Sequence, residues 1–240
     1  MEAKDKLIVA LDVDTVQRAL ELVERLRDTV GMFKIGMQLF TAAGPDIVRR
    51  IVDQGSEVFL DLKYHDIPNT VGLAAVEATR LGVSLFNVHA SGGREMMLRT
   101  AEAVAQTAAR EGLRKPRVLG VTLLTSLDTD ALAAVGIEAE AESLVAKLAL
   151  VAADCGLDGV VASAREIRIV REAVSRSDFL IVTPGIRSAR NASDDQRRTM
   201  TAADAIRAGA DYLVVGRPVI ADENPRHAAE QLVKEISEGR

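Results

Sequence analysis

The sequence predicts an α/β protein and, within that class, a single (β/α)8 TIM barrel. Short runs rich in β-branched residues alternate with longer amphipathic stretches along the whole chain, which indicates βαβ units and a parallel sheet. About eight such runs share the 240 residues, leaving about 30 residues for each unit, close to one βαβ step. This count favours a closed barrel, and an open doubly wound sheet is the alternative on periodicity alone.

Eight strands are expected in order along the chain. Each is a short run in which aliphatic and β-branched side chains predominate, as in strands buried on both faces. The expected strands are Leu7–Asp12, Phe33–Gly36, Val58–Lys63, Leu85–His89, Val118–Leu123, Gly159–Ala162, Leu180–Thr183 and Tyr212–Gly216.

Amphipathic stretches between these runs predict helices, and turn residues separate the two kinds of segment. No linker, low-complexity tract or strong repeat interrupts the pattern, so residues 1–240 are expected to form one domain. The polar segment Ser188–Asp195 follows the seventh strand and is expected to be a mobile loop or a plain surface connection. The clearest helical stretches are Thr15–Asp28, Gly44–Gln54, Asn69–Leu81, Arg94–Glu111 and Ala141–Cys155.

Composition and charge exclude several classes of function. The formal charge of −5 opposes nucleic acid as the main partner, because phosphate backbones recruit basic surfaces. The first residues lack the apolar core of a signal peptide, and no apolar run approaches the roughly 18 residues that span a bilayer. Cys155 is the single cysteine, so no internal disulfide can form, which indicates a reducing compartment. The expected location is the cytoplasm.

Charged residues lie at the carboxyl ends of the first four expected strands, where such barrels carry their active sites. Asp12 ends the first strand, Lys34 lies in the second, Asp61 and Lys63 close the third, and His89 ends the fourth. One such charge is often a solvated strand end. Charges on four successive strands at the same end indicate a site.

The third strand predicts where its charges point. Side chains alternate faces along a strand, so Phe59, Asp61 and Lys63 share one face and the apolar residues between them share the other. The apolar face suits the helix layer, which directs Asp61 and Lys63 toward the barrel axis beside Lys34. An inward charge needs a partner, or its pKa moves toward the neutral form. Lysine and aspartate in alternation would keep each other ionised.

Two other interpretations of these residues stay open. The array could be a buried ion-pair network without chemistry, although buried ion pairs seldom add net stability. Asp61, His65 and His89 could instead bind a metal ion, but Lys34 and Lys63 in the same mouth would repel a divalent cation. For either histidine taken singly, a hydrogen-bonded structural role is the simpler one.

The last two strands predict a phosphate site, because loops after strands seven and eight commonly bind phosphate in this barrel class. Gly216 allows backbone N–H groups to approach an oxyanion, Arg217 can make a bidentate contact, and Pro218 suits the first turn of a helix. The sequence contains no glycine-rich dinucleotide loop and no Walker loop, so neither NAD nor ATP is implied. Polar chemistry on a phosphorylated small molecule fits these features.

At these residues the sequence resembles the orotidine 5′-monophosphate decarboxylase family over nearly the whole chain. The most specific match is Asp61–Thr70, DLKYHDIPNT, against the family signature D-x-K-x-x-D-I-P-N-T. Tyr64 and Ser188 depart from the common pattern, and neither change removes a functional group. The resemblance implies decarboxylation of orotidine monophosphate to uridine monophosphate, with no cofactor or metal, in de novo pyrimidine synthesis. Further matching segments are Val9–Asp12, Lys34–Gly36, Asn87–Ala90, Leu124–Ser126, Thr183–Arg187, Asp195–Arg198 and Val215–Pro218.

The resemblance also implies roles for individual residues. Lys34, Asp61 and Lys63 match members of a charged tetrad, with Lys63 as the proton donor to C6 of the pyrimidine. The fourth member, Asp66, would reach the partner's site in a homodimer, accompanied by two neighbours on its loop, Ile67 and Thr70. The implied substrate contacts are Asp12 and Lys34 to the ribose, Thr125 to the pyrimidine, Arg187, Gln196, Gly216 and Arg217 to the phosphate, and Pro184.

Rival functions remain open at this point. Keto-gulonate-phosphate decarboxylases and hexulose-phosphate synthases share the Asp-x-Lys-x-x-Asp core but use a metal-stabilised enediolate. Lys34, the continuation Ile67–Thr70 and the loop that carries Gln196 favour the orotidine interpretation. A catalytically silent nucleotide-binding barrel is the rival from another class.

Overall fold

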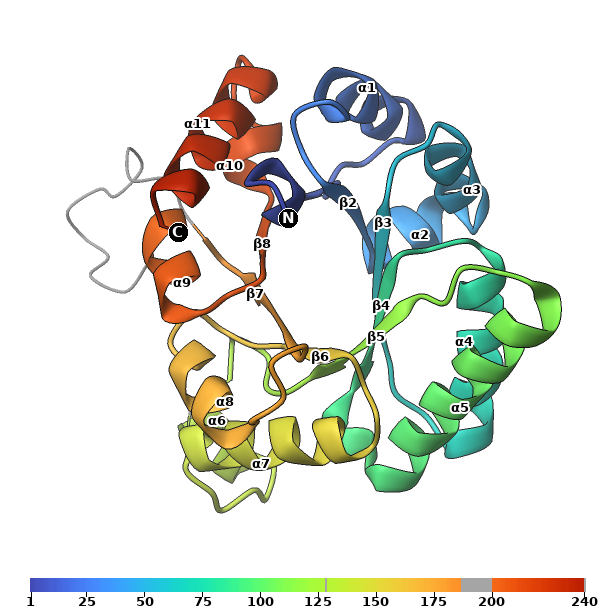
Figure 1. Cartoon of the computed structure of the whole chain (residues 1–240), viewed down its shortest axis with the longest axis vertical. Coiled ribbons are helices and arrows are strands. Elements are labelled where there is room, and N and C mark those ends of the chain that lie inside the picture. Colours follow the sequence, from blue (N-terminus) through green and yellow to red (C-terminus); the bar gives the residue numbers. More distant parts are fainter. Residues whose placement is uncertain (128, 187–199, 240) are drawn as a thin grey trace.

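The computed structural model is a closed barrel of eight parallel strands inside a ring of helices (Figure 1). It describes residues 1–127, 129–186 and 200–239. Strands neighbour one another in chain order, and β1 pairs with both β2 and β8, which closes the barrel and confirms the predicted fold. The strands are β1 Leu7–Ala10, β2 Met32–Gly36, β3 Val58–Tyr64, β4 Leu85–His89, β5 Arg117–Val121, β6 Gly159–Val161, β7 Leu180–Pro184 and β8 Tyr212–Val215.

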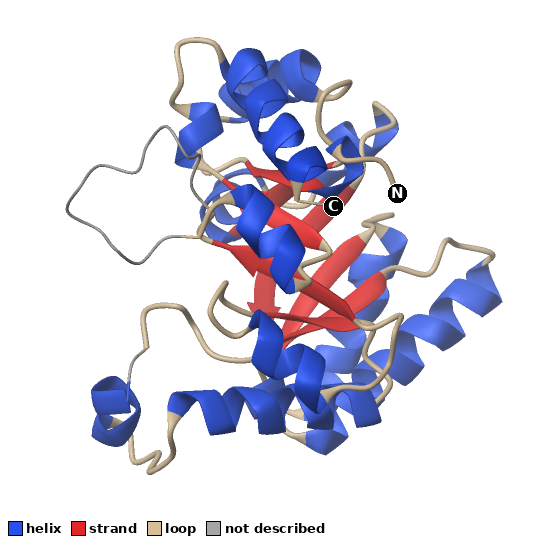
Figure 2. Ribbon diagram, turned by 60° about the vertical axis from the view of Figure 1, so that its left-hand side comes forward, coloured by secondary structure: helices blue, strands red, loops and turns tan. Residues whose placement is uncertain are grey.

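Helices cover the outside of the strands, and Figure 2 shows them above, below and in front of the central sheet. The five amphipathic stretches correspond to α1, α3, α4, α5 and α7.

No helix in the described ranges has the combined length and apolar character that crossing a membrane requires. The helices are α1 Val16–Leu26, α2 Met37–Ala43, α3 Asp46–Asp53, α4 Pro68–Arg80, α5 Arg94–Glu111, α6 Thr129–Ala134, α7 Ala141–Asp154, α8 Ile167–Ala173, α9 Ala202–Ala208, α10 Arg217–Ile220 and α11 Pro225–Glu238, with 3-10 turns η1 Lys4–Lys6 and η2 Ala90–Gly92.

Local sequence determines where several helices begin. The Thr15 hydroxyl accepts the N–H of Arg18 and caps α1, and Thr201 caps α9 by accepting the N–H of Asp204. Pro68 begins α4, where its missing N–H costs no helical hydrogen bond. These caps define where the loops at the carboxyl end of the barrel finish.

The core has two layers, separated by the sheet. Inward side chains such as Ile8, Phe59 and Val182 fill the barrel. Side chains one position along, such as Val9 and Leu60, point outward and pack against the helices. Each strand is therefore buried on both faces, which is why the parallel strands read as continuous apolar runs.

Four strands, β1, β5, β6 and β8, end one or two residues earlier than the sequence predicts. The first residues past β1, β5 and β6, which are Leu11, Thr122 and Ala162, stay buried at the barrel mouth although they are no longer strand residues. Asp12 therefore lies beyond β1, although the preceding Leu11 still donates its N–H to the Lys34 carbonyl at 2.9 Å. Asp12 can thus reach over the mouth instead of standing in the barrel wall.

Candidate active site

Strand β3 carries its charges on the inner side, as predicted. Phe59 belongs to the inner layer of the core, and Asp61 and Lys63 line a cavity at the carboxyl end of the barrel. In the β2–β3 register, Gly36 lies opposite Asp61. Lys34 stands two residues before Gly36 on the same face, and this brings its long side chain up to the Asp61 carboxylate.

Four side chains form a row of alternating charge at this mouth. Lys63 Nζ lies 2.6 Å from Asp61 Oδ1, and Lys34 Nζ lies 3.3 Å from Asp61 Oδ2. Lys34 Nζ also donates to Asp12 Oδ1 at 3.2 Å. Asp61 thus holds a different lysine on each oxygen, with 13% of its side chain exposed, whereas Asp12 is 54% exposed and lies at the rim.

The pKa of Asp61 is held below its ordinary value. Burial raises the pKa of the carboxyl group, but the charges of Lys34 and Lys63 and the hydrogen bonds from Lys63 and Asn87 together outweigh burial. Asp61 is therefore ionised at neutral pH. The prediction that lysine and aspartate keep each other charged is confirmed for this carboxylate.

The backbone at Lys63 is strained. Its φ of +52° is the one positive value at a non-glycine position in the described residues, and such a conformation costs about 1 kcal/mol. The register of β3 with β4 shifts between Leu60 and Tyr64, and the Lys63 N–H donates to the side chain of Asn87, at 2.8 Å from Oδ1. Strain of this kind concentrates at functional sites.

Asn87 is a member of the cluster to which the sequence analysis gave no role, although Asn87 begins the matching segment Asn87–Ala90. It lies in the middle of β4, is 0% exposed, and donates from Nδ2 to Asp61 Oδ1 at 2.7 Å. The available signal was one polar residue inside the apolar run Leu85–Val88. That signal names no partner, because only the pairing of β4 with β3 brings Asn87 to Asp61.

The cluster borders a cavity of about 180 Å³. Pockets for drug-sized ligands begin at about 300 Å³, so this one fits a single ring better than a whole nucleotide. Five predicted residues meet here, namely Lys34, Asp61, Lys63, Thr125 and Pro184. The remaining lining is mainly apolar and consists of Phe59, Val121, Leu123, Leu124, Val161, Ala162, Ser163 and Val214.

A wider hollow of about 550 Å³ adjoins this cavity. The two share Leu124, Thr125, Ser163 and Pro184. Ser163 follows β6 and had no role in the sequence interpretation, because a serine after a strand is an ordinary loop residue. Together the two spaces provide a narrow end beside the lysines and a wider end for the rest of a ligand.

The rings of His65 and His89 contact each other at a tilt of 37°, with 5.2 Å between their centroids. Burial, then the charges of His65 and Lys63, lower the pKa of His89 against a smaller opposing effect of Asp61. Within the ranges that the structure describes, no three His, Cys, Asp or Glu side chains are gathered so that they could hold a metal ion. The contacts of Asp61 are with two lysines and an amide.

The predicted phosphate residues lie partly within the described structure. Gly216 precedes α10, and a Cβ added there would lie 3.4 Å from Asp12 Oδ2. Arg217 follows at the surface. Arg187, Gln196 and the expected loop Ser188–Asp195 lie outside the described residues.

The loop after β3 holds the remaining predicted residues, and the structure does not bring them to the cavity of their own chain. Asp66 is exposed and accepts the N–H of Ile67 at 2.6 Å. Ile67 is 67% exposed, and Thr70 is exposed on the first turns of α4.

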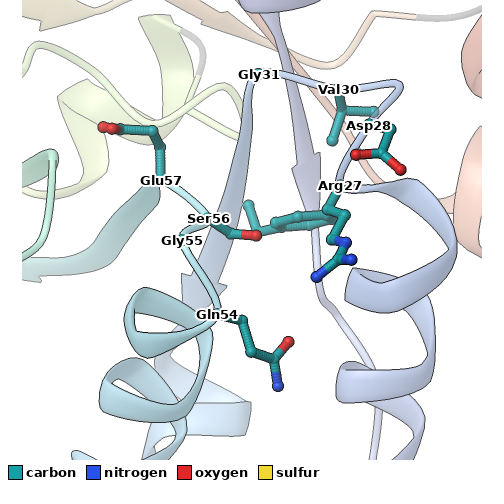
Figure 3. A pocket seen from close by; sticks show the side chains of 9 residues that line it. Arg27, Asp28, Val30, Gly31, Gln54, Gly55, Ser56 and Glu57 are labelled. Carbon is teal, nitrogen blue, oxygen red and sulfur yellow. The ribbon is translucent and has the colours of Figure 1, made fainter.

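A separate hollow of about 250 Å³ lies at the opposite end of the barrel, where β2 and β3 begin. Figure 3 shows Arg27 and Gln54 extending into it from just beyond α1 and α3. No predicted site residue lines it. Because barrels of this kind carry their active sites at the carboxyl end, the cavity beside Lys63 is the candidate site.

A (β/α)8 barrel with a row of alternating lysines and aspartates beside a carboxyl-end cavity defines a barrel enzyme for small polar molecules. The sequence pattern of the Orotidine 5'-phosphate decarboxylase / HUMPS family matches residues 5–232. The chain belongs to this family, which confirms the resemblance seen in the sequence.

Proteins named orotidine 5'-phosphate decarboxylase resemble this chain over nearly its whole length. The protein of Syntrophotalea carbinolica is 54% identical over 237 residues, which cover 99% of this chain and 97% of that protein. The protein of Geobacter sulfurreducens is 53% identical over 238 residues, with coverage of 99% and 98%. The crystal structure of the Lactobacillus acidophilus protein matches with a TM-score of 0.85 at 35% identity, covering 96% of this chain and 98% of that one.

Proposed function

We propose that this protein converts orotidine 5′-monophosphate to uridine 5′-monophosphate and CO2, without cofactor or metal, as the last step of de novo pyrimidine synthesis. The observation that carries the proposal is the row Lys34, Asp61 and Lys63 beside a cavity that fits one ring. Relatives that bear this enzyme's name at more than half identity support the choice of substrate.

The reaction is demanding because it leaves an electron pair at pyrimidine C6 in an orbital that the ring delocalises poorly. Enzymes lower such barriers by up to ~23 kcal/mol. Lys63 is the group that meets this need. As the bond between C6 and the carboxylate breaks and CO2 leaves, the electron pair stays on C6 and takes a proton from the Lys63 ammonium group. Solvent then returns a proton to Lys63.

Asp61 has two roles in this proposal. Its Oδ1 holds Lys63 Nζ at 2.6 Å and so aims the proton donor. Its negative charge would also lie beside the departing carboxylate, which favours loss of that charge as CO2. Lys34 keeps Asp61 ionised from the other side, and in this proposal Lys34 and its partner Asp12 would bind the ribose hydroxyls.

We assign the phosphate group to the loops after β7 and β8. Pro184, Gly216 and Arg217 would form its surroundings in the described residues, together with Arg187 and Gln196. The absence of a side chain at Gly216 leaves room beside Asp12. Phosphate binding far from C6 can drive loop closure, so that remote binding energy raises the rate of the chemical step.

A homodimer completes the proposed site. The chain's own Asp66 forms no ion pair with Lys34 or Lys63, whose carboxylate partners are Asp12 and Asp61, and Ile67 and Leu73 expose 67% and 60% of their surface nearby. A second copy would cover this apolar surface and bring its Asp66, Ile67 and Thr70 to the cavity. The cytoplasmic location also remains a proposal, supported by the single, buried Cys155.

The direct test is to incubate the purified protein with orotidine 5′-monophosphate in EDTA and to follow CO2 release and uridine monophosphate formation. Rapid turnover in EDTA is the expected result. Turnover of sugar phosphates only after magnesium is added would favour the metal-dependent rivals. Tight binding of uridine monophosphate by folded protein without turnover would favour the silent barrel.

The shared site has its own test. Lys63→Ala and Asp66→Asn protomers are each expected to be nearly inactive alone. Mixing them should restore some activity, because a mixed dimer holds one site in which both Lys63 and Asp66 are intact. No recovery after subunit exchange has been verified by mass spectrometry would count against the contribution of Asp66 across the interface.

A further inference from the structure

The side chain of Asn87 contacts the proposed proton donor by two routes. Its Oδ1 accepts the backbone N–H of Lys63 at 2.8 Å. Its Nδ2 donates at 2.7 Å to Asp61 Oδ1, the same oxygen that receives Lys63 Nζ at 2.6 Å. One amide on β4 therefore touches the backbone of Lys63 directly and its ammonium group through Asp61.

The partners determine the orientation of this amide. A backbone N–H can only donate, so the atom facing Lys63 must be the oxygen, and an ionised carboxylate can only accept, so the atom facing Asp61 must be the nitrogen. Both requirements select the same rotation of the side chain. Because Asn87 is 0% exposed, water does not compete for either bond.

Each of the two hydrogen bonds of Asn87 has a local structural role. Lys63 has a φ of +52° where the β3–β4 register shifts, and its N–H would be left without a partner if the Asn87 oxygen were removed. Asp61 Oδ1 needs a second donor to stay fixed while Lys63 approaches it. A purely structural asparagine would need only one of these contacts.

We propose that Asn87 is a positioning residue that holds Lys63 and Asp61 in the geometry for proton delivery. This inference rests on the proposed decarboxylation. A buried residue that acts through others should change the chemical step and leave binding of the ring and phosphate nearly intact, because Asn87 does not line the cavity.

The test compares Asn87→Ala and Asn87→Asp with Thr100→Val, a matched change of a 0% exposed polar residue on α5. We expect Asn87→Ala to lower kcat about 100-fold, the loss typical of small misplacements, while KM and the Kd for uridine monophosphate change less than about threefold. Thr100→Val should keep wild-type kcat. A wild-type kcat in Asn87→Ala would overturn the proposal.

Asn87→Asp keeps the shape of the side chain and an oxygen that accepts the Lys63 N–H. This variant therefore tests the proposal even if Asn87→Ala folds poorly. The new carboxylate would face Asp61, whose other charged neighbours are Lys34 on β2 and Lys63 on β3, with His89 further along β4. Two adjacent carboxylates raise the pKa of Asp61, so the acid limb of the kcat/KM profile should move to higher pH. An acid limb of the kcat/KM profile at the same pH as in the wild type would contradict the positioning role of Asn87.

A crystal structure of Asn87→Ala decides the geometry without relying on the reaction. We expect Lys63 to leave its positive φ or its Nζ to leave Asp61. If both stay in place, the positioning role is wrong, whatever the substrate. If the wild type fails to turn over orotidine 5′-monophosphate but Lys63 moves in the variant, the proposed function is wrong and the positioning role stands.

Discussion

The two ends of this barrel both carry ionic side chains and use them differently. At the amino end, Arg171 donates to the carbonyl oxygens of Phe179 and Gly209 and pairs with Asp211 at 2.6 Å. Asp211 in turn accepts the N–H of Ile181 near the start of β7. These charges satisfy backbone groups where the last strands begin, a need that every buried strand end has.

At the carboxyl end, Lys34, Asp61 and Lys63 contact one another and face a cavity. Among the described residues, these two ammonium groups pair with the carboxylates of Asp12 and Asp61 and with no backbone carbonyl, and Lys63 is held in a strained conformation. The comparison shows that the position of a charged residue at a strand end does not by itself reveal its role. The contacts of the charged group distinguish one that stabilises the fold from one that is positioned for catalysis.

The largest expected effect is at Lys63. Lys63→Ala should fold and bind uridine monophosphate but lose turnover by at least about 10⁴-fold, because proton transfer and electrostatic stabilisation each contribute about 100-fold or more. Steady-state decarboxylation measures this loss. Lys115→Ala, which removes a half-exposed lysine at the amino end, should retain wild-type turnover. Wild-type-like activity in Lys63→Ala would remove Lys63 as the acid.

At Arg171 we expect a smaller effect, and one on folding stability instead of turnover. Arg171→Gln should lower the free energy of unfolding by about 2 kcal/mol, since Asp211 and two carbonyls lose a charged donor, and leave kcat unchanged. Urea titration and activity at 25 °C measure the two quantities. Arg49→Gln, which breaks an exposed pair with Asp46, should cost less than about 1 kcal/mol. A large fall in kcat for Arg171→Gln would contradict the division between the ends.

The smallest effect is a pH dependence at the carboxyl end. The pKa of His89 is lowered in the folded protein, so below its ordinary value of about 6.5 the unfolded chain binds a proton that the folded chain resists. Stability should therefore fall as pH drops from 6.5 toward the folded pKa. His89→Gln should show a weaker loss between pH 7 and pH 5 in thermal unfolding. If the wild type and His89→Gln lose the same stability between pH 7 and pH 5, protonation of His89 is not coupled to folding.

Sequence patterns predict most of the architecture and the centre of the site. The eight apolar runs correspond to the eight strands, because burial on both faces leaves an unmistakable composition. The inward direction of Asp61 and Lys63 follows from the two-residue period of a strand. The ends of β1, β5, β6 and β8 were less predictable, since residues past a strand end at the mouth, such as Leu11 and Ala162, are as buried as those within the strands.

The site contains members that the chain pattern does not reveal. Asn87 lies in a matching segment but received no role from the sequence, and Ser163 was not singled out. Both join the site because parallel pairing brings β4 to β3 and β6 to the cavity. The positive φ of Lys63 depends on a register shift between two strands. Such a shift is a property of the assembled sheet, not of β3 alone.

The sequence by itself determined that this is an α/β protein with eight strands, which strand faces are polar, and which residue types meet at the carboxyl end, because these follow from local periodicity and chain order; it favoured a closed barrel, and the pairing of β1 with β8 settled that choice. The tertiary structure alone decided which oxygen of Asp61 holds which lysine, that Asn87 supports both Lys63 and Asp61, and that Asp66 stays apart from its own cluster. Those outcomes depend on strand register and on ångström distances between segments far apart in the chain, which short-range patterns do not encode.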